Sequence, residues 1–410
     1  MSSKSTLYIS YDGMTDSLGQ SQVLPYLCGL SKRGYLITLL SCEKPERFEQ
    51  FKPTIESICI EANINWQPIM YHAKPPIIST LKDIKNLYEL AYSLHHQYQF
   101  SIVHCRSYIA ALVGLSMKEK FGTKFLFDMR GFWADERVDG NLWRLSNPMY
   151  KIIYNYFKKK EKVFLIEADH IISLTNAAKS EINSWSLTPK SLPITVIPCC
   201  VDTTLFSTEN VTHQQQDELR SALALKQSDF VIGYVGSIGT WYLLDEMLDY
   251  FKTMLQKQKS IFLFITNEPA SMILEEAQKK NIPKEVFVIR SVARKEVPLY
   301  ISIMNYSLFF IKPSFSKMAS SPTKQGEIMA MGKPVVCNAR VGDTEFVVNQ
   351  YQSGVVVSDF KTVDFDCAIN AINKQTFDAA TIRRGAIEFY GLDKGIALYA
   401  GIYDQLSSTK

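Results

Sequence analysis

Short apolar runs alternate with helical patterns along most of this 410-residue sequence, and this alternation constrains the fold more than any other feature. Near the start, an apolar run at 7–11 is followed by a helical segment at about 22–33 and a second run at 36–42. Alternation of this kind predicts a parallel, doubly wound sheet with helices on both faces. The pattern restarts at Phe230, and the chain is longer than one hydrophobic core usually supports. The sequence therefore predicts two α/β domains.

Composition excludes several classes of protein. The net charge of +4 is too small to favour nucleic-acid binding, and no run of 18 apolar residues is present to span a membrane. The eight cysteines form no C-x-x-C pair and lie mostly in apolar segments, so we expect reduced thiols and no metal site. The first residues, MSSKSTLYISYDG, lack the apolar core of a signal peptide. These features predict a cytoplasmic protein.

The stretch SSPTKQGEIMAMGKPVVCNARVG carries the strongest local signals in the sequence. Ser321 is predicted to cap a helix whose first position is Pro322, and residues 323–331 have a helical composition. Gly332 suits the position after the helix, and 334–338 is predicted to be a short buried strand.

Three polar residues, Thr323, Lys324 and Glu327, project from one side of this predicted helix because they lie three and four positions apart. A helix N-terminus and a lysine suit an anion such as a diphosphate. Glu327 lies about 9 Å along the helix from Ser321, where a carboxylate can accept from a ribose diol. The alternative is a solvent-facing Lys324–Glu327 ion pair.

This stretch resembles the donor-binding helix of the family-four retaining glycosyltransferases, whose GT-B fold has two Rossmann-like domains facing across a cleft. In that family two glutamates lie eight positions apart, and Glu327 matches the second, which binds the ribose of the nucleotide. The first glutamate would fall at Ala319 and is absent, as in a branch with SSPTK-like sequences. Ser320 and Ser321 are then the nearest candidates to bind the hydroxyls of the donor sugar.

The resemblance extends to three further parts of the chain on the donor side. The loop YDGMTDSLGQSQVLPYL resembles the first loop of the same branch, which makes Gly19 a candidate for the donor phosphates and Gln20 one for the acceptor. By itself, this glycine loop could equally be a tight connection. Gly236 and Ser237 form a second candidate phosphate loop, although the arginine and lysine typical of the family are missing there. Val292 lies in the turn where the family places the base.

On the acceptor side, a charged segment at 128–141 follows an apolar strand, and parallel strands end where ligands bind. The family carries a His or Asp that faces the reacting sugar at this strand end, and Asp128 matches it. With Lys324 and Glu327, Asp128 completes the predicted catalytic set. Arg106, Arg130 and Arg137 are candidates to hold an acceptor phosphate. A solvated loop with local ion pairs is the alternative.

The resemblance implies two domains, an acceptor-side one at 1–199 and a nucleotide-sugar-binding one at 200–385. The C-terminal helix at about 386–405 is expected to pack back on the first domain, and the polar segment 202–227 is interpreted as a linker.

The implied activity is retaining, metal-independent transfer from a UDP- or GDP-linked sugar, which is a substrate and not a cofactor, to a glycan or lipid-linked acceptor. The branch points to bacterial surface polysaccharide synthesis. Basic and aromatic residues at 142–162 suit peripheral contact with the inner face of the cell membrane, and equally an ordinary helix with a solvated lysine face. A catalytically degenerate partner subunit and a sugar-nucleotide epimerase are the alternative functions.

Overall fold

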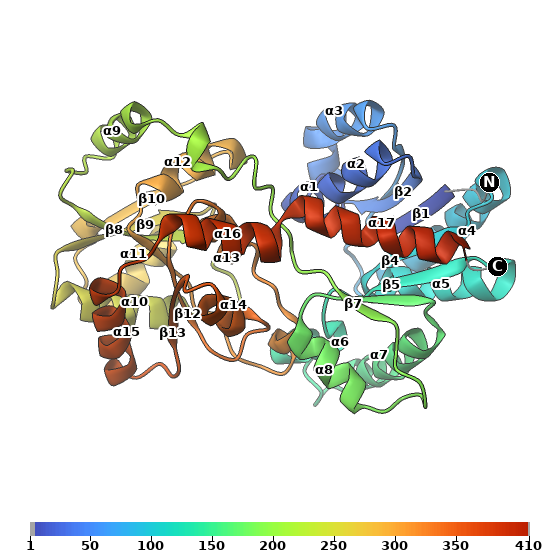
Figure 1. Ribbon diagram of the computed structural model, residues 1–410. Helices are drawn as coiled ribbons and strands as arrows, with labels where there is room; N and C mark the ends of the chain where they lie inside the picture. Colours follow the sequence, from blue (N-terminus) through green and yellow to red (C-terminus); the bar gives the residue numbers. More distant parts are fainter. Residues whose placement is uncertain (1–4, 409–410) are drawn as a thin grey trace. The chain divides into compact units, whose positions relative to one another are not determined.

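The computed structural model describes residues 5–408, which form two compact units (Figure 1). Unit 1 contains the chain up to Pro198 and the segment from Leu392 onward, and unit 2 is Cys199–Gly391. Each unit is built on one sheet whose strands are all parallel. Two Rossmann-like α/β units confirm the predicted fold class.

The sheet of unit 1 has the strand order β3-β2-β1-β4-β5-β6-β7, so the chain starts in the middle and builds outward in both directions. Every residue of β1 is buried, as expected for a parallel strand with helices on both faces. The strands are β1 Ser5–Ser10, β2 Leu36–Glu43, β3 Asn65–Met70, β4 Ile102–Arg106, β5 Lys124–Asp128, β6 His170–Ser173 and β7 Ile194–Val196.

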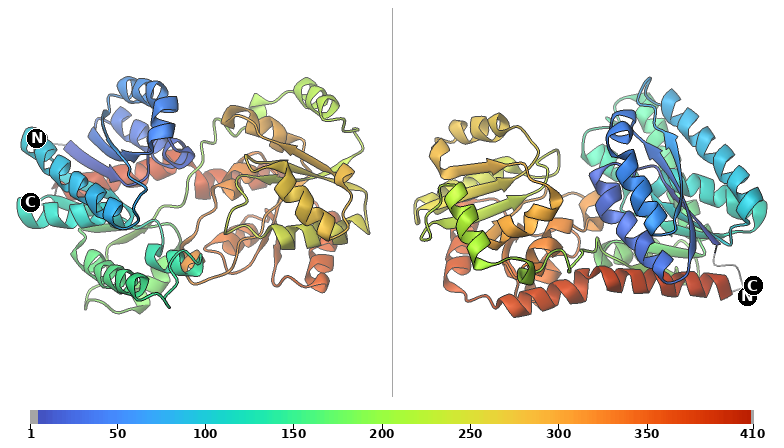
Figure 2. Two further views of the ribbon diagram at one scale, coloured as in Figure 1. Left: turned by 180° about the vertical axis from the view of Figure 1, so that it is seen from behind. Right: turned by 90° about the horizontal axis from the view of Figure 1, so that it is seen from above.

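Helices lie on both faces of this sheet (Figure 2). They are α1 Ser17–Gln22, α2 Leu24–Lys32, α3 Pro45–Glu61, α4 Ile78–Tyr98, α5 Ser107–Phe121, α6 Trp133–Asp139, α7 Pro148–Glu167, α8 Asn176–Ser184 and, from the end of the chain, α17 Leu392–Ser408. The last helix packs closely on α2, because a Cβ added at Gly29 would lie 2.3 Å from Ile396 Cδ1. In the same contact, Tyr35 OH donates to the carbonyl of Ala400 at 2.8 Å.

Unit 2 repeats the architecture with the strand order β10-β9-β8-β11-β12-β13. The strands are β8 Phe230–Val235, β9 Ser260–Ile265, β10 Phe287–Arg290, β11 Tyr306–Leu308, β12 Val335–Asn338 and β13 Gly354–Val357. The helices are α9 His213–Ala222, α10 Leu244–Leu255, α11 Ala270–Lys279, α12 Val297–Ser302, α13 Thr323–Ala330, α14 Thr344–Gln350, α15 Thr362–Lys374 and α16 Ala379–Tyr390. Short 3₁₀ turns are η1 Thr208–Asn210, η2 Lys284–Val286, η3 Arg294–Glu296 and η4 Ser316–Ala319.

The interpretation of 202–227 as a linker is wrong, because this segment contains η1 and α9. A capping box starts α9: Gln215 N donates to Thr212 Oγ1 at 3.2 Å, and Thr212 N donates to Gln215 Oε1 at 2.8 Å. The charged segment 128–141 likewise contains α6 and is not only a loop.

All eight cysteines are free thiols, and six of them are buried, in agreement with the expectation from sequence. Across residues 5–408, no helix has the length and apolar character needed to cross a membrane.

Candidate functional site

The helix predicted from the strongest local signals is α13, but it starts differently than expected. Its cap position is held by Pro322 and receives no side-chain hydrogen bond. Ser321 is therefore not the N-cap, and its Oγ instead accepts from the backbone N–H of Cys199 at 3.1 Å. Gly332 follows the helix with φ of 65°, the left-handed conformation expected after a helix end.

Lys324 is buried against aromatic rings. Its side chain is 7% exposed, Nζ donates to Tyr234 OH at 2.8 Å, and Nζ lies 3.4 Å from the centroid of the Tyr242 ring. Burial lowers the pKa of Lys324 well below its ordinary value, although the charge of Glu327 opposes this shift. A buried amine in this state is stabilised in its charged form by any anion that approaches it.

Glu327 is buried beside a different partner. Its side chain is 7% exposed, and its Oε1 lies 2.8 Å from Arg294 Nη2. Burial raises the pKa of Glu327, and the charges of Arg294 and Lys324 oppose that shift. Because both side chains are buried and each has its own partner, the alternative of a solvent-facing Lys324–Glu327 pair is excluded.

The turn after β8 approaches Lys324 closely. Gly236 has φ of +112°, which favours glycine, and a Cβ added there would make a tight contact of 3.2 Å with Lys324 Nζ. The carbonyl of Ser237 accepts from Tyr234 OH at 2.5 Å. The structure therefore brings together the predicted residues Gly236, Ser237 and Lys324.

The remaining predicted donor residues lie around this group. Thr323 and Ser320 are half-buried at the start of α13, and Ala319 is buried where the family has its first glutamate. Val292 is half-buried in the loop after β10, two residues before Arg294. A second lysine–aromatic pair is present nearby in sequence, since Lys317 Nζ lies 3.6 Å from the centroid of the Trp241 ring.

In unit 1, Asp128 is at the C-terminal end of β5 and is 1% exposed. Tyr399 OH donates to Asp128 Oδ2 at 2.9 Å, and His104 Nε2 lies 3.5 Å from the same oxygen. Arg130 Nη1 lies 3.9 Å from Oδ1. Burial favours the neutral acid, but the charge of Arg130 and the contact with His104 outweigh it and lower the pKa of Asp128. Asp128 is therefore a buried carboxylate held in its charged form.

Arg106 ends the neighbouring strand β4 and pairs in register with Asp128. It is 4% exposed, its Nε lies 3.4 Å from Asp12 Oδ2, and its Nη1 is a buried atom without a hydrogen-bond partner. Asp128, Arg130 and Arg106 thus lie together at one edge of the sheet. Arg137 does not join them by a direct contact, because its guanidinium lies over the Trp133 ring at 5.1 Å.

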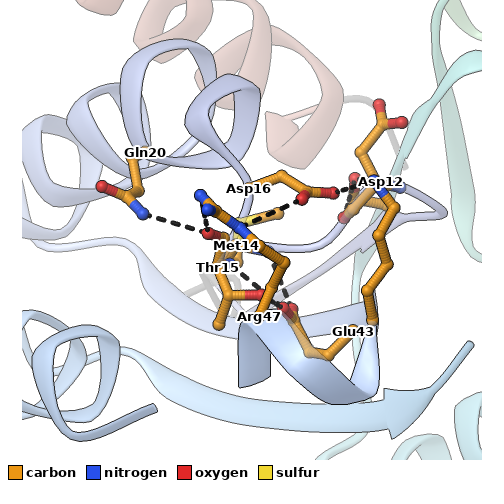
Figure 3. A network of polar contacts seen from close by, with 9 residues as sticks. Asp12, Met14, Thr15, Asp16, Gln20, Glu43 and Arg47 are labelled. Atoms are coloured by element: carbon orange, nitrogen blue, oxygen red, sulfur yellow. Dashed lines mark hydrogen bonds and ion pairs between the residues drawn. The ribbon is translucent and has the colours of Figure 1, made fainter. Parts of the chain in front are cut away.

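Gly19 and Gln20 lie in the short helix α1 and not in the predicted loop. The segment before this helix is anchored by Glu43, the last residue of β2 (Figure 3). Glu43 is fully buried and accepts from Met14 N at 2.7 Å, Thr15 N at 3.0 Å and Thr15 Oγ1 at 2.6 Å. Gln20 Nε2 donates to the carbonyl of Thr15 at 3.1 Å. A Cβ added at Gly19 would lie 2.3 Å from the Gly13 carbonyl oxygen, so close packing accounts for this glycine.

Several partners of the predicted residues were not identified from the sequence. Tyr234 is one of them: its ring centroid lies 4.0 Å from Lys324 Nζ, and the apolar run of β8 did not predict this contact. Arg294 begins the 3₁₀ turn η3, which no sequence pattern predicted. Tyr399 lies 271 residues from Asp128, and only the fold shows that they meet.

Family models match both halves of the chain. Residues 215–386 match the family described as Glycosyl transferases group 1, and residues 21–205 match Glycosyltransferase Family 4. Among curated proteins, none matches the sequence significantly.

Solved structures share the fold at low sequence identity. Sucrose-phosphate synthase from Thermosynechococcus elongatus has a TM-score of 0.72 at 15% identity, over 99% of this chain and 100% of the other. A glycosyltransferase from Rickettsia africae ESF-5 has a TM-score of 0.72 at 15% identity, over 99% of each chain. HepE of Anabaena, in complex with UDP and glucose, has a TM-score of 0.68 at 11% identity, over 98% of this chain and 99% of the other.

Proposed function

This chain is a glycosyltransferase of the GT-B type, and we propose that it moves a sugar, with retention of configuration and without a metal ion, from a nucleotide-sugar donor to a glycan or lipid-linked acceptor. The observation that carries the proposal is the buried Lys324, whose Nζ contacts Tyr234 and Tyr242 beside the glycine turn at Gly236. An amine in this position is suited to bind the diphosphate of the donor. The ribose of the donor then lies beside Arg294 and Glu327, and Glu327 accepts hydrogen bonds from its diol.

In the proposed mechanism, Lys324 is protonated when the diphosphate binds and stabilises the charge that develops on it as the glycosidic bond to the sugar breaks. The departing phosphate takes the proton of the acceptor hydroxyl, so no strong enzymatic base is required. Asp128, which is held in its charged form, orients the acceptor or stabilises positive charge at the anomeric carbon. Positioning of the two substrates supplies much of the remaining rate enhancement.

The donor nucleotide is proposed to be UDP or GDP. The structure of HepE contains UDP and glucose, which supports a uridine donor as the first to test. A role in bacterial surface polysaccharide synthesis rests on the resemblance of the SSPTK stretch to one branch of the family.

The first experiment is thermal melting with UDP, GDP, ADP and their sugars. A ligand at 100 times its dissociation constant stabilises the folded protein by about 2.7 kcal/mol, which melting detects easily. We expect a shift with one nucleotide class, and loss of that shift in Glu327→Gln but not in the control Glu275→Gln, an exposed residue of α11.

Melting and an assay of the nucleotide sugar without acceptor together separate the alternatives. If no nucleotide shifts the melting temperature, the degenerate partner subunit that the absent glutamate at Ala319 suggests is favoured instead. Interconversion of a free nucleotide sugar without any acceptor would favour an epimerase.

We also propose peripheral membrane contact through residues 142–162. Three apolar residues of α7, which we term the α7 stripe, lie three or four positions apart and face solvent: Met149, Ile152 and Tyr156 are 46%, 70% and 47% exposed. Leu145, which precedes the helix, is 37% exposed. The exposed lysines Lys151 and Lys159 accompany the stripe. An apolar helix face with flanking lysines suits an anionic bilayer surface, as expected at the inner face of the cell membrane.

Sedimentation with vesicles that contain anionic lipid tests this contact. Ile152→Glu should lower the bound fraction severalfold, whereas the control Ile60→Glu, at an apolar residue of α3 that is 79% exposed, should not. Equal binding by both variants would remove the α7 stripe from the proposal.

A further inference from the structure

A histidine–aspartate pair lies just after β3, apart from the residues used above. His72 Nδ1 is 2.5 Å from Asp83 Oδ1, and the backbone N–H of His72 donates to Asp83 Oδ2 at 3.1 Å. Tyr11 OH donates to the same Oδ2 at 3.1 Å. The Asp83 side chain, near the start of α4, is 0% exposed. Both of its oxygens are therefore engaged inside the protein, and they fix the orientation of the imidazole ring.

This orientation turns the other ring nitrogen of His72 outward. An ionised carboxylate only accepts hydrogen bonds, so we assign the proton to Nδ1, which leaves Nε2 on the outer side. The His72 side chain is 36% exposed, and Lys82 Nζ lies 3.3 Å from Nε2. Within residues 5–408, Lys82 makes no ion pair with a carboxylate. The Lys82 ammonium and Nε2 thus lie next to each other on the outer side of the ring, and the buried Asp83 lies on the other side.

The position lies at the edge of the sheet that carries the candidate acceptor residues. The strand order β3-β2-β1-β4-β5 places the C-terminal ends of these parallel strands in one row, and ligands of doubly wound sheets bind beyond such ends. Side-chain contacts connect the row: Tyr11, after β1, reaches Asp83, and the next residue, Asp12, contacts Arg106 at the end of β4. His72 and Arg106 therefore both lie at the C-terminal ends of the strands of this sheet.

We propose that His72 Nε2 and Lys82 Nζ form an anion-binding subsite for the phosphate or diphosphate of the acceptor. When the anion binds, Lys82 donates to it, and His72 takes a proton from solvent so that Nε2–H donates as well. Asp83 stabilises the resulting imidazolium through Nδ1–H. Alternatively, His72 could serve only to fix the connection between β3 and α4. That role uses Nδ1 and the backbone N–H of His72, and anions would then leave Nε2 and Lys82 unaffected. The assignment of the anion to an acceptor rests on the proposed function.

Histidine NMR spectroscopy of the full chain tests the subsite directly, because the sequence contains only six histidines. In the free protein, we expect the ¹⁵N shifts of His72 to show a proton on Nδ1 and none on Nε2. Inorganic pyrophosphate should move the Nε2 signal toward its protonated value. Lys82→Gln, a surface change that leaves the fold intact, should weaken this response at least tenfold. The control Lys85→Gln, an exposed lysine of the same helix that pairs with Glu89, should not.

If pyrophosphate at millimolar concentration leaves the His72 signals in place, or if Lys82→Gln and Lys85→Gln respond alike, the proposal is overturned. Two further arms separate the sources of the anion: a response to vesicles that carry a polyprenyl diphosphate supports a lipid-linked acceptor, and a response to a soluble sugar phosphate supports a phosphorylated glycan.

Thermal melting of the Lys82→Gln variant with nucleotides tests the proposed function separately from this subsite. We expect the nucleotide-induced shifts to be unchanged. Shifts with nucleotides but none of His72 with pyrophosphate would overturn the subsite alone. A His72 response without any nucleotide shift would leave the subsite standing and overturn the donor assignment.

Discussion

At the scale of single residues, Lys324 combines a cost to stability with a role in binding. A buried amine that has no carboxylate partner destabilises the folded protein, since its charged form is disfavoured there. Lys324→Met should therefore leave the melting temperature of the free protein unchanged or raised, and should abolish the shift that nucleotide causes. Tyr234 OH still donates to the Ser237 carbonyl in the variant. Melting with and without nucleotide measures both effects.

The difference in stability between the wild-type protein and Lys324→Met should depend on pH in one direction. The pKa of Lys324 is lower in the folded than in the unfolded chain, so the unfolded chain binds more protons between the two values and stability rises with pH across that interval. The stability advantage of Lys324→Met should therefore shrink as the pH rises toward 10.5, the ordinary lysine value. Lys333→Met is the control, because burial also lowers the pKa of Lys333, to about 8, at a position before β12. Loss of the nucleotide shift in Lys333→Met as well would contradict a specific role for Lys324.

Two tyrosines of α17 make hydrogen bonds of different strength in the core of unit 1. Tyr399 OH donates to the charged Asp128, whereas Tyr403 OH pairs with Nδ1 of His104, whose pKa burial lowers. Hydrogen bonds to charged groups contribute about 1.5–3 kcal/mol and neutral ones about 0.5–1.5. Urea unfolding should thus show a greater loss for Tyr399→Phe than for Tyr403→Phe. The reverse order would mean that Asp128 is not charged in the folded protein.

The sequence predicted some of these residues and not their partners. Lys324, Glu327 and Asp128 were found because each lies in a local pattern, a helix start or a strand end. Tyr399 and Arg294 have no such pattern, and Glu43 reads as an ordinary residue at the end of a strand. Their roles depend on contacts between segments far apart in the chain, which local periodicity does not encode.

At the scale of elements, the turn between β8 and α10 in unit 2 is sensitive to a single added methyl group. Gly236→Ala places a Cβ 3.2 Å from Lys324 Nζ at φ of +112°, where a side chain is strained. We expect a loss of about 1–3 kcal/mol in unfolding free energy and weaker nucleotide binding. Gly401→Ala, in α17 with nothing within 4 Å of the added Cβ, should instead stabilise by about 0.5–1 kcal/mol. Calorimetry of both variants checks the contrast.

The accuracy of the predicted elements follows the strength of their apolar pattern. The run FVIGYV gives β8 with the expected bounds, because its residues are almost all buried. No element was predicted for α3 and β3. The first is polar and contains Pro53, and every residue of the second is only half-buried, so neither shows a clean periodicity. The helix α9 was missed because its polar composition hid the capping box at Thr212.

At the scale of the whole molecule, unit 1 is completed by a segment that follows unit 2 in the chain. The helix α17 inserts Ile396, Tyr399 and Tyr403 into unit 1, where they are 5%, 3% and 0% exposed. Burial of each such side chain contributes about 1.5–3 kcal/mol. Their sum is comparable to the total stability of a typical domain, about 5–15 kcal/mol. Unit 1 therefore depends on the end of the chain, whereas every strand of unit 2 lies between Cys199 and Gly391.

A chain that ends at Gly391 should consequently lose the structure of unit 1 and keep that of unit 2. Hydrogen exchange measures both: amides of β1 and β4 should lose their protection, while those of β8 and β12 remain protected and gain further protection from the nucleotide that shifts the full chain. A chain that ends at Ser408 keeps α17 and serves as the control. If β1 stays protected in the shorter chain, the contacts of α17 contribute little to unit 1. If β8 also loses protection, the two units do not fold independently, and the donor residues around Lys324 require the whole chain.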